Sequence, residues 1–220
     1  MNQLAIFDCD GTLVDSGASI HRALRAAFEV HGLECPPPSV SRKVIGLSLV
    51  EAMAMLAPEA DHEALSRTYK DAFFSMRSGG LVEEPLFDGI LPLMDALEAE
   101  GWLLAVATGK SDRGLRHCLE SHGIHARFVS LQTADRHPSK PHPGMAVAAI
   151  AEAGAAPATS VVIGDTSYDI GMALAAGAGA IGAGWGYHDE DELSAAGAHG
   201  IASEPAAVLP IARQWMEKAA

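Results

Sequence analysis

The sequence predicts a doubly wound α/β fold built on a parallel sheet. Short apolar runs alternate with amphipathic helical segments along most of the 220 residues, and such alternation is typical of repeated strand–helix–strand units. The strand candidates are apolar almost throughout, which favours strands buried on both faces. One long stretch near the N-terminus contains no strand candidate, which indicates an inserted helical subdomain.

Five strands and four connecting helices are expected in this α/β part. The strands are expected at 4–8, 102–107, 127–132, 160–164 and 179–184. The helices are expected at 91–100, 112–121, 145–152 and 168–175, where apolar residues recur three and four positions apart. The glycines that end these helices are Gly101, Gly123, Gly154 and Gly177.

The strandless stretch follows the first strand. Its helical candidates are 19–31, 49–56 and 63–76. A crossover between parallel strands needs only about a dozen residues, so the extra length indicates a separate unit. We therefore expect residues 1–14 and 85–220 to form the α/β core, and residues 15–84 an all-α subdomain inserted into it.

Composition excludes several classes of protein. Hydrophobic residues make up 49% of the chain, too many for a disordered protein. With 15 basic and 28 acidic residues the formal net charge is −13, which disfavours binding to nucleic acid or to an anionic membrane surface. The three scattered cysteines favour reduced thiols, and no signal peptide or membrane span is evident. We therefore expect a cytoplasmic protein, as a monomer or small homo-oligomer.

Two carboxylates follow the first strand. Asp8 and Asp10 stand two residues apart, just before Gly11. A carboxylate fixed at a strand end can act as a nucleophile, and a second one nearby can act as an acid or base. Two negative groups this close also favour a hard cation such as Mg²⁺. The alternative is a polar turn that leads into a helix.

Hydroxyl and lysine side chains occupy two later loops. Thr108, Gly109 and Lys110 follow the second strand and precede a helix, an arrangement that can bind an anion. Lys140 stands directly before Pro141 and could present a fixed positive charge to a phosphate. Taken separately, an ordinary helix cap and a surface loop are the simpler explanations of these residues.

A second pair of carboxylates follows the fourth strand. Asp165 comes directly after the strand and Asp169 one helical turn later, so both are expected to face the same crevice as Asp8 and Asp10. They could supplement a metal site. The alternative is that Asp165 caps the helix and that Asp169 complements the helix dipole.

In their order along the chain, the four motifs resemble those of the haloacid dehalogenase superfamily. The resemblance is strongest to its phosphoglycolate phosphatase-like group. The matching segments are 8–16, 108–110, 140–143 and 164–169. The resemblance implies a Rossmann-like core, with the helical subdomain in the place of that group's cap. It also implies a Mg²⁺-dependent phosphatase that hydrolyses a small phosphomonoester, with phosphoglycolate as a candidate substrate.

The resemblance further implies a role for each motif residue. Asp8 would be the nucleophile that forms an aspartyl-phosphate, and Asp10 the general acid and base. Thr108, Gly109 and Lys140 would bind the phosphoryl oxygens, and Lys140 would also assist catalysis. The implied metal ligands are Asp8, Asp10 through its backbone carbonyl, Asp165 and, in support, Asp169. The group often has asparagine where Gly109 stands, so only backbone contacts are possible there.

Specificity is expected to come from the cap. Arg42, Lys43 and Gly46 lie on a segment that faces the crevice in related proteins, although solvated helix charges explain the first two equally well. Other activities of the superfamily stay open: a pyrophosphatase, a phosphomutase or a C–halogen hydrolase. Asp10 argues against the last, because a halide leaving group needs no proton. A non-catalytic binding protein is disfavoured by the complete motif set.

Overall fold

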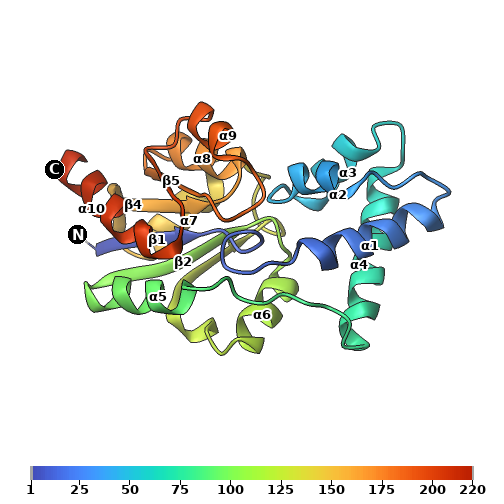
Figure 1. Ribbon diagram of the computed structural model, residues 1–220, viewed down its shortest axis with the longest axis horizontal. Helices are drawn as coiled ribbons and strands as arrows, with labels where there is room; N and C mark the ends of the chain where they lie inside the picture. The colour runs from blue at the N-terminus through green and yellow to red at the C-terminus, as the bar shows by residue number, and fades with distance from the viewer. Residues whose placement is uncertain (1, 220) are drawn as a thin grey trace.

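A six-stranded parallel sheet forms the centre of the molecule (Figure 1). The computed structural model describes residues 2–219. Its strands are β1 (Asn2–Phe7), β2 (Trp102–Thr108), β3 (Phe128–Thr133), β4 (Ala155–Gly164), β5 (Gly179–Ala183) and β6 (Gly200–Ala202). They are arranged in the order β3-β2-β1-β4-β5-β6, and every neighbouring pair is parallel. The predicted doubly wound fold is therefore confirmed, with its topological switch point between β1 and β4.

Helices cover both faces of the sheet. On one face α5 (Ile90–Ala99), α6 (Asp112–Ser121) and α10 (Val208–Ala219) pack around Phe7. On the other face α7 (Gly144–Glu152), α8 (Ser167–Ala175) and α9 (Glu190–Ala195) pack around Ile6. Two short 3₁₀ segments, η2 (His125–Arg127) and η3 (Pro205–Ala207), precede β3 and α10. Neighbouring residues of a strand point to opposite faces of the sheet, and both faces are covered by helices. This is why the strands contain nearly continuous apolar runs.

The sheet departs from the sequence prediction at two places. The strand β6 was not predicted, because its three residues are too short to carry a pattern. The strand β4 begins at Ala155, five residues before the predicted start, and its pairing with β1 shifts register between Asn2 and Leu4. The extra residues of β4 are partly exposed, so they lacked the apolar signature of a buried strand.

The stretch after β1 forms a helical insertion, here defined as α1 to α4 (right in Figure 1). Its elements are α1 (Gly17–Val30), α2 (Pro38–Ser41), the 3₁₀ segment η1 (Arg42–Val44), α3 (Leu49–Leu56) and α4 (His62–Ser78). It has its own apolar cluster, which includes Leu24, Phe28, Met53 and Leu65. Within residues 2–219, no helix has both the length and the apolar character needed to cross a bilayer.

Two paired connections join the helical insertion to the core. The Asp15 amide donates to the Pro85 carbonyl at 2.8 Å, and the Phe87 amide donates to the Leu13 carbonyl at 3.0 Å. Between these bonds Val14 forms an antiparallel bridge with Leu86. The outgoing and returning segments therefore lie side by side, close to the carboxyl end of β1.

Candidate active site

Asp8 is a buried carboxylate directly after β1. Its Oδ1 accepts a hydrogen bond from the Cys9 amide at 2.6 Å and lies 2.9 Å from Lys140 Nζ. Its Oδ2 is equally buried but has no hydrogen-bond partner within the described residues. Burial raises the pKa of Asp8 to about 7, although Lys140 opposes this shift. A buried acceptor without a partner is rare in folded proteins and indicates an atom kept available for a ligand.

Lys140 lies between two of the predicted carboxylates. Its side chain is fully buried, and its Nζ lies 2.6 Å from Asp169 Oδ1 as well as 2.9 Å from Asp8 Oδ1. Burial alone would lower the pKa of Lys140, but Asp169 and Asp8 outweigh burial and raise it. Lys140 is therefore a fixed cation at the ends of β1 and β4, and its contact with a phosphoryl group stays a prediction.

Asp165 and Asp169 complete an acidic cluster with Asp8. Carboxylate oxygens of the three buried residues lie within 4.8 Å of one another. Burial, with Asp169 and Asp8 nearby, raises the pKa of Asp165 well above its usual range. The unpartnered Oδ2 of Asp8 and this set of hard oxygen ligands fit a divalent cation such as Mg²⁺.

Neighbouring residues hold the two later carboxylates in place. Asp165 Oδ1 accepts from Thr12 Oγ1 at 2.8 Å, and its Oδ2 accepts from the Tyr187 amide at 2.9 Å. Thr166, not Asp165, is the N-cap of α8, and Asp169 completes the capping box with it. Asp169 therefore has a structural role in α8 besides its contact with Lys140.

Asp10 lies in a different electrostatic environment. Its Oδ1 contacts Lys110 Nζ at 2.7 Å and accepts a hydrogen bond from Ser16 Oγ. Lys110 also pairs with Glu84 at 2.7 Å, and Glu84 pairs with Arg77 of α4 at 2.7 Å. The carboxylate of Asp10 is thus held apart from the acidic cluster, which suits a separate role in proton transfer. Metal binding through its backbone carbonyl stays a prediction.

The predicted phosphate-binding residues follow β2. Thr108 is buried, and its Oγ1 accepts a hydrogen bond from the Lys110 amide at 3.3 Å. A Cβ added at Gly109 would lie 2.3 Å from the carbonyl oxygen of Leu47 in the helical insertion. Glycine is therefore needed there because the helical insertion packs directly on its backbone.

A segment of the helical insertion covers Asp8. Gly46 has a φ of +97°, and a Cβ added there would lie 3.8 Å from Asp8 Oδ2. The Ser48 amide donates to Ser139 Oγ of the core at 2.8 Å. This segment thus lies close to Asp8, and contact of Gly46 with substrate stays a prediction.

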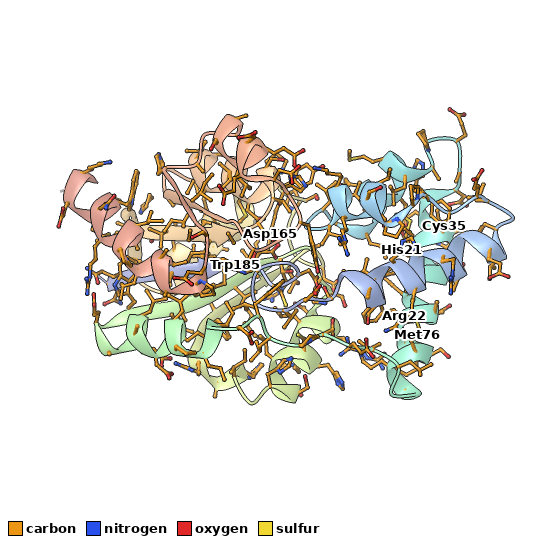
Figure 2. The ribbon with its side chains drawn as sticks, in the orientation of Figure 1. His21, Arg22, Cys35, Met76, Asp165 and Trp185 are labelled. Carbon is orange, nitrogen blue, oxygen red and sulfur yellow. The ribbon has the colours of Figure 1, made fainter. Side chains whose placement is uncertain are left out.

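The two predicted cap cations lie outside the acidic cluster. Lys43 Nζ pairs with Glu192 of α9 at 2.5 Å, so the core itself engages its charge. Arg42 lines a second hollow with Asp15 and Glu83. Contact of either residue with substrate stays a prediction. His21 contacts Ser41 Oγ at 3.0 Å and lies among the insertion's helices, away from Asp165 (Figure 2).

Sequence reasoning missed three residues of the site: Lys110, Thr12 and Tyr187. Lys110 stood within a recognised motif, but nothing in the sequence indicated its contact with Asp10. Thr12 lies in the same segment as Asp8, so its proximity to the strand end was the available signal. Tyr187 belongs to the loop after β5, where Trp185 Nε1 also donates to the Thr12 carbonyl at 3.0 Å.

Comparison with known proteins gives the family. The family model "Haloacid dehalogenase-like hydrolase" matches residues 5–183. The chain belongs to this family, and it is a hydrolase of the phosphatase type. A solved structure of a haloacid dehalogenase-like family protein from Streptococcus pneumoniae is 25% identical, with a TM-score of 0.83 over 95% of this chain and 97% of that one.

Among curated proteins the chain is similar to enzymes that act on phosphate groups. It is 36% identical over 201 residues to "Probable phosphatase IndB" of Dickeya dadantii, covering 89% of this chain and 87% of that protein. It is 31% identical over 191 residues to phosphoglycolate phosphatase of Xylella fastidiosa, covering 85% and 82%. It is 35% identical over 175 residues to tyrosine-protein kinase PtkA of Mycobacterium tuberculosis, covering 79% of this chain but 59% of that protein.

Proposed function

We propose that this protein is a Mg²⁺-dependent phosphatase that hydrolyses small phosphomonoesters through an aspartyl-phosphate on Asp8. The observation that carries the proposal is the buried, unpartnered Asp8 Oδ2 beside Lys140 and the acidic cluster. Phosphoglycolate, which is in the name of the Xylella relative, is the first ester to test.

The reaction would proceed in two steps. Asp8 Oδ2 attacks phosphorus, and the bond between phosphorus and the leaving oxygen breaks as Asp10 gives that oxygen a proton. Asp10 then takes a proton from water, whose oxygen attacks phosphorus and breaks the bond to Asp8. Inorganic phosphate leaves, and Asp8 returns to its carboxylate form.

The remaining residues supply charge and position. Lys140, the Thr108 hydroxyl and the Gly109 amide would bind the phosphoryl oxygens as charge develops on them. Asp8, Asp165, Asp169 and the Asp10 carbonyl would hold Mg²⁺, which neutralises phosphoryl charge when bound. The pKa of about 7 for Asp8 applies without a cation, and a bound cation would favour the ionised nucleophile.

The first test is phosphate release from a generic aryl phosphate with and without Mg²⁺. We expect turnover only with the metal, and none in the Asp8→Asn variant, because an amide is a far poorer nucleophile. The matched control is Asp88→Asn on the exposed surface, which should keep full activity. Circular dichroism would check that each variant is folded. Wild-type turnover in Asp8→Asn, or no turnover across a broad panel of esters, would contradict the proposal.

A further inference from the structure

We propose that the leaving group of the substrate carries a ring-sized apolar body, so that esters of aromatic or branched alcohols are preferred over phosphoglycolate. The inference rests on the proposed function and specifies its substrate class. It starts from a cavity of about 580 Å³ between the helical insertion and the core.

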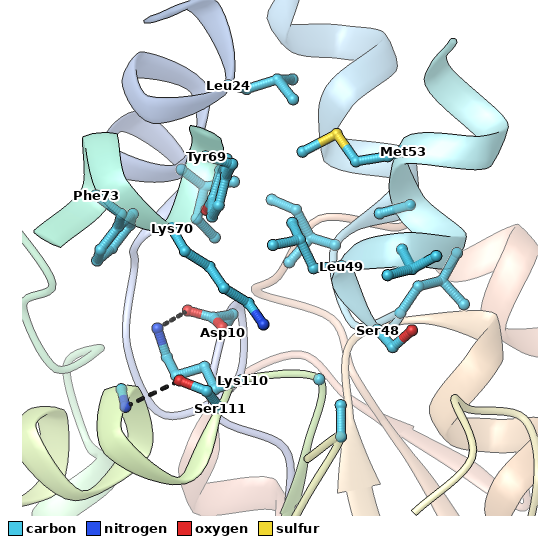
Figure 3. A pocket seen from close by; sticks show the side chains of 18 of the residues that line it. Asp10, Leu24, Ser48, Leu49, Met53, Tyr69, Lys70, Phe73, Lys110 and Ser111 are labelled. Carbon is cyan, nitrogen blue, oxygen red and sulfur yellow. Dashed lines mark hydrogen bonds and ion pairs between the residues drawn. The ribbon is translucent and has the colours of Figure 1, made fainter. Parts of the chain in front are cut away.

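The position of the cavity assigns it to the leaving group. Asp10, Gly109 and Lys110 line its core side and Gly46 lines its insertion side, whereas Asp8 lies outside its lining. Because Asp10 is to protonate the leaving oxygen, whatever is attached to that oxygen must extend beyond Asp10. The space beyond Asp10 is this cavity, with Asp10 and Lys110 at its floor (Figure 3).

The walls of the cavity are largely apolar. Leu24 of α1, Leu49 and Met53 of α3, and Tyr69 and Phe73 of α4 all line it, and Figure 3 shows them around one space. Pockets of roughly 300–1,000 Å³ with mostly apolar and aromatic lining are typical of sites for drug-sized ligands. A two-carbon acid would fill only a small part of such a volume and would leave these walls without contacts.

The cations of the cavity argue against a carboxylate in the leaving group. Lys110 and Arg77 are already paired with Asp10 and Glu84. The two other lining cations, Lys70 and Arg113, are exposed to solvent. Lys70 extends toward Asp10 (Figure 3), but water reaches both side chains and screens their attraction for an anion. A glycolate carboxylate would lose its hydration among apolar side chains without a dedicated buried partner, which is costly. Burial of an apolar body in the same place is favourable, because it removes apolar surface from water.

The test compares three esters with similarly basic alkoxide leaving groups. With Mg²⁺ present, kcat/KM should be about tenfold or more higher for 2-phenylethyl phosphate than for ethyl phosphate or phosphoglycolate. Leu49→Gln, which places an amide in the cavity wall, should reduce this preference about tenfold. Leu81→Gln is the matched control, since Leu81 is 61% exposed and lies outside the cavity lining. Equal or higher kcat/KM for phosphoglycolate would overturn the inference.

Binding of phosphonates separates this inference from the proposed function. 2-Phenylethylphosphonate and ethylphosphonate cannot be hydrolysed, and calorimetry on the wild-type protein with Mg²⁺ measures their affinities without turnover or a variant. We expect the phenyl compound to bind about tenfold or more tightly. A phosphonate preference without turnover of any ester would support the cavity assignment and refute the proposed function. Turnover of esters without a phosphonate preference would support the proposed function and refute the cavity assignment.

Discussion

Asp8 and Asp10 are two positions apart, but each lies beside its own lysine. Lys140 contacts Asp8 from the loop before α7, and Lys110 contacts Asp10 from the loop after β2. Both lysines are almost completely shielded from water, so water screens the attraction within each pair less than in a surface ion pair. This arrangement gives the proposed nucleophile and the proposed proton-transferring carboxylate separate partners within a single turn of the chain.

At the residue scale, Thr12 offers a test of the metal site. Thr12→Val keeps the shape of the side chain but removes the hydroxyl that donates to Asp165 Oδ1. Loss of a group that orients a metal ligand typically costs about 10–100-fold in metal affinity. We expect the Mg²⁺ concentration for half-maximal activity to rise by about that factor, and Thr12→Ser to restore most of it. An unchanged Mg²⁺ dependence in Thr12→Val would refute this role.

The acidic cluster could be predicted because each of its members follows a strand closely. The carboxyl ends of parallel strands meet at one edge of the sheet, so Asp8 and Asp165 had to lie near each other. Lys110 and Tyr187 gave no such signal. Their contacts with Asp10 and Asp165 depend on how two loops fold back toward the site, which no local pattern encodes.

At the element scale, the close contact between Gly109 and Leu47 should control how the helical insertion packs on the core. Gly109→Ala would force a Cβ to within 2.3 Å of the Leu47 carbonyl oxygen, so one backbone must shift. Because the same segment carries Gly46 over Asp8, we expect kcat/KM to fall by at least about tenfold, with unchanged circular dichroism. Gly79→Ala meets only ordinary contacts beyond 3.4 Å and is the control. Equal activity in both variants would show that this contact does not matter.

Glu84 links the helical insertion to the core through two ion pairs. Burial alone would raise the pKa of Glu84, but Lys110 and Arg77 outweigh it and lower the pKa below its usual 4.5. A lowered folded-state pKa means that ionised Glu84 stabilises the protein above pH 4.5 and that this contribution is lost as the pH falls through the folded-state pKa.

Glu84→Gln tests that linkage. At neutral pH the variant should lose on the order of 3 kcal/mol of unfolding free energy, because a buried ion-pair network loses its anion. Urea unfolding at neutral pH and again below pH 4.5 would measure the difference from wild type, which should shrink in acid. A difference that is independent of pH would mean that the effect comes from packing rather than charge.

The main helices and the insertion could be predicted because their apolar periodicity is strong and their lengths are ordinary. The strand β6 could not, since three residues at a sheet edge carry no period. The ion pair of Lys43 is a similar case, because nothing in its place in the chain indicated Glu192 of α9 as a partner. Side-chain contacts between elements that are distant in the sequence depend on the whole fold, so no local sequence pattern predicts them.

At the scale of the whole molecule, we expect a divalent cation to raise the free energy of unfolding. The protein has a net charge of −13, and part of that charge is buried. Three of the buried acids lie in one cluster, so a bound cation removes repulsion there. At a Mg²⁺ concentration about 100 times its Kd, binding would add about 2.7 kcal/mol, or roughly 5–11 °C in Tm for a chain of this size.

Thermal unfolding with and without Mg²⁺ would measure this gain. Asp165→Asn should abolish most of it, while Asp88→Asn should keep it. Sodium chloride at matched ionic strength controls for general screening. A shift of equal size with sodium chloride, or in Asp165→Asn, would argue against the proposed site.

The paired connections beside β1 also limit how the two parts of the molecule can move. A domain held by one linker can swivel in all directions, but two hydrogen-bonded linkers leave mainly one degree of freedom, a rotation about the line between them. Gly46 belongs to the side that would turn, and so does Arg77, which pairs with Glu84. The Glu84 carbonyl, in contrast, contacts His122 Nε2 of the core at 2.7 Å. Such a rotation would uncover Asp8 and separate Arg77 from Glu84 in the same motion, so admission of substrate and loosening of the ion pairs beside Asp10 would be one mechanical event.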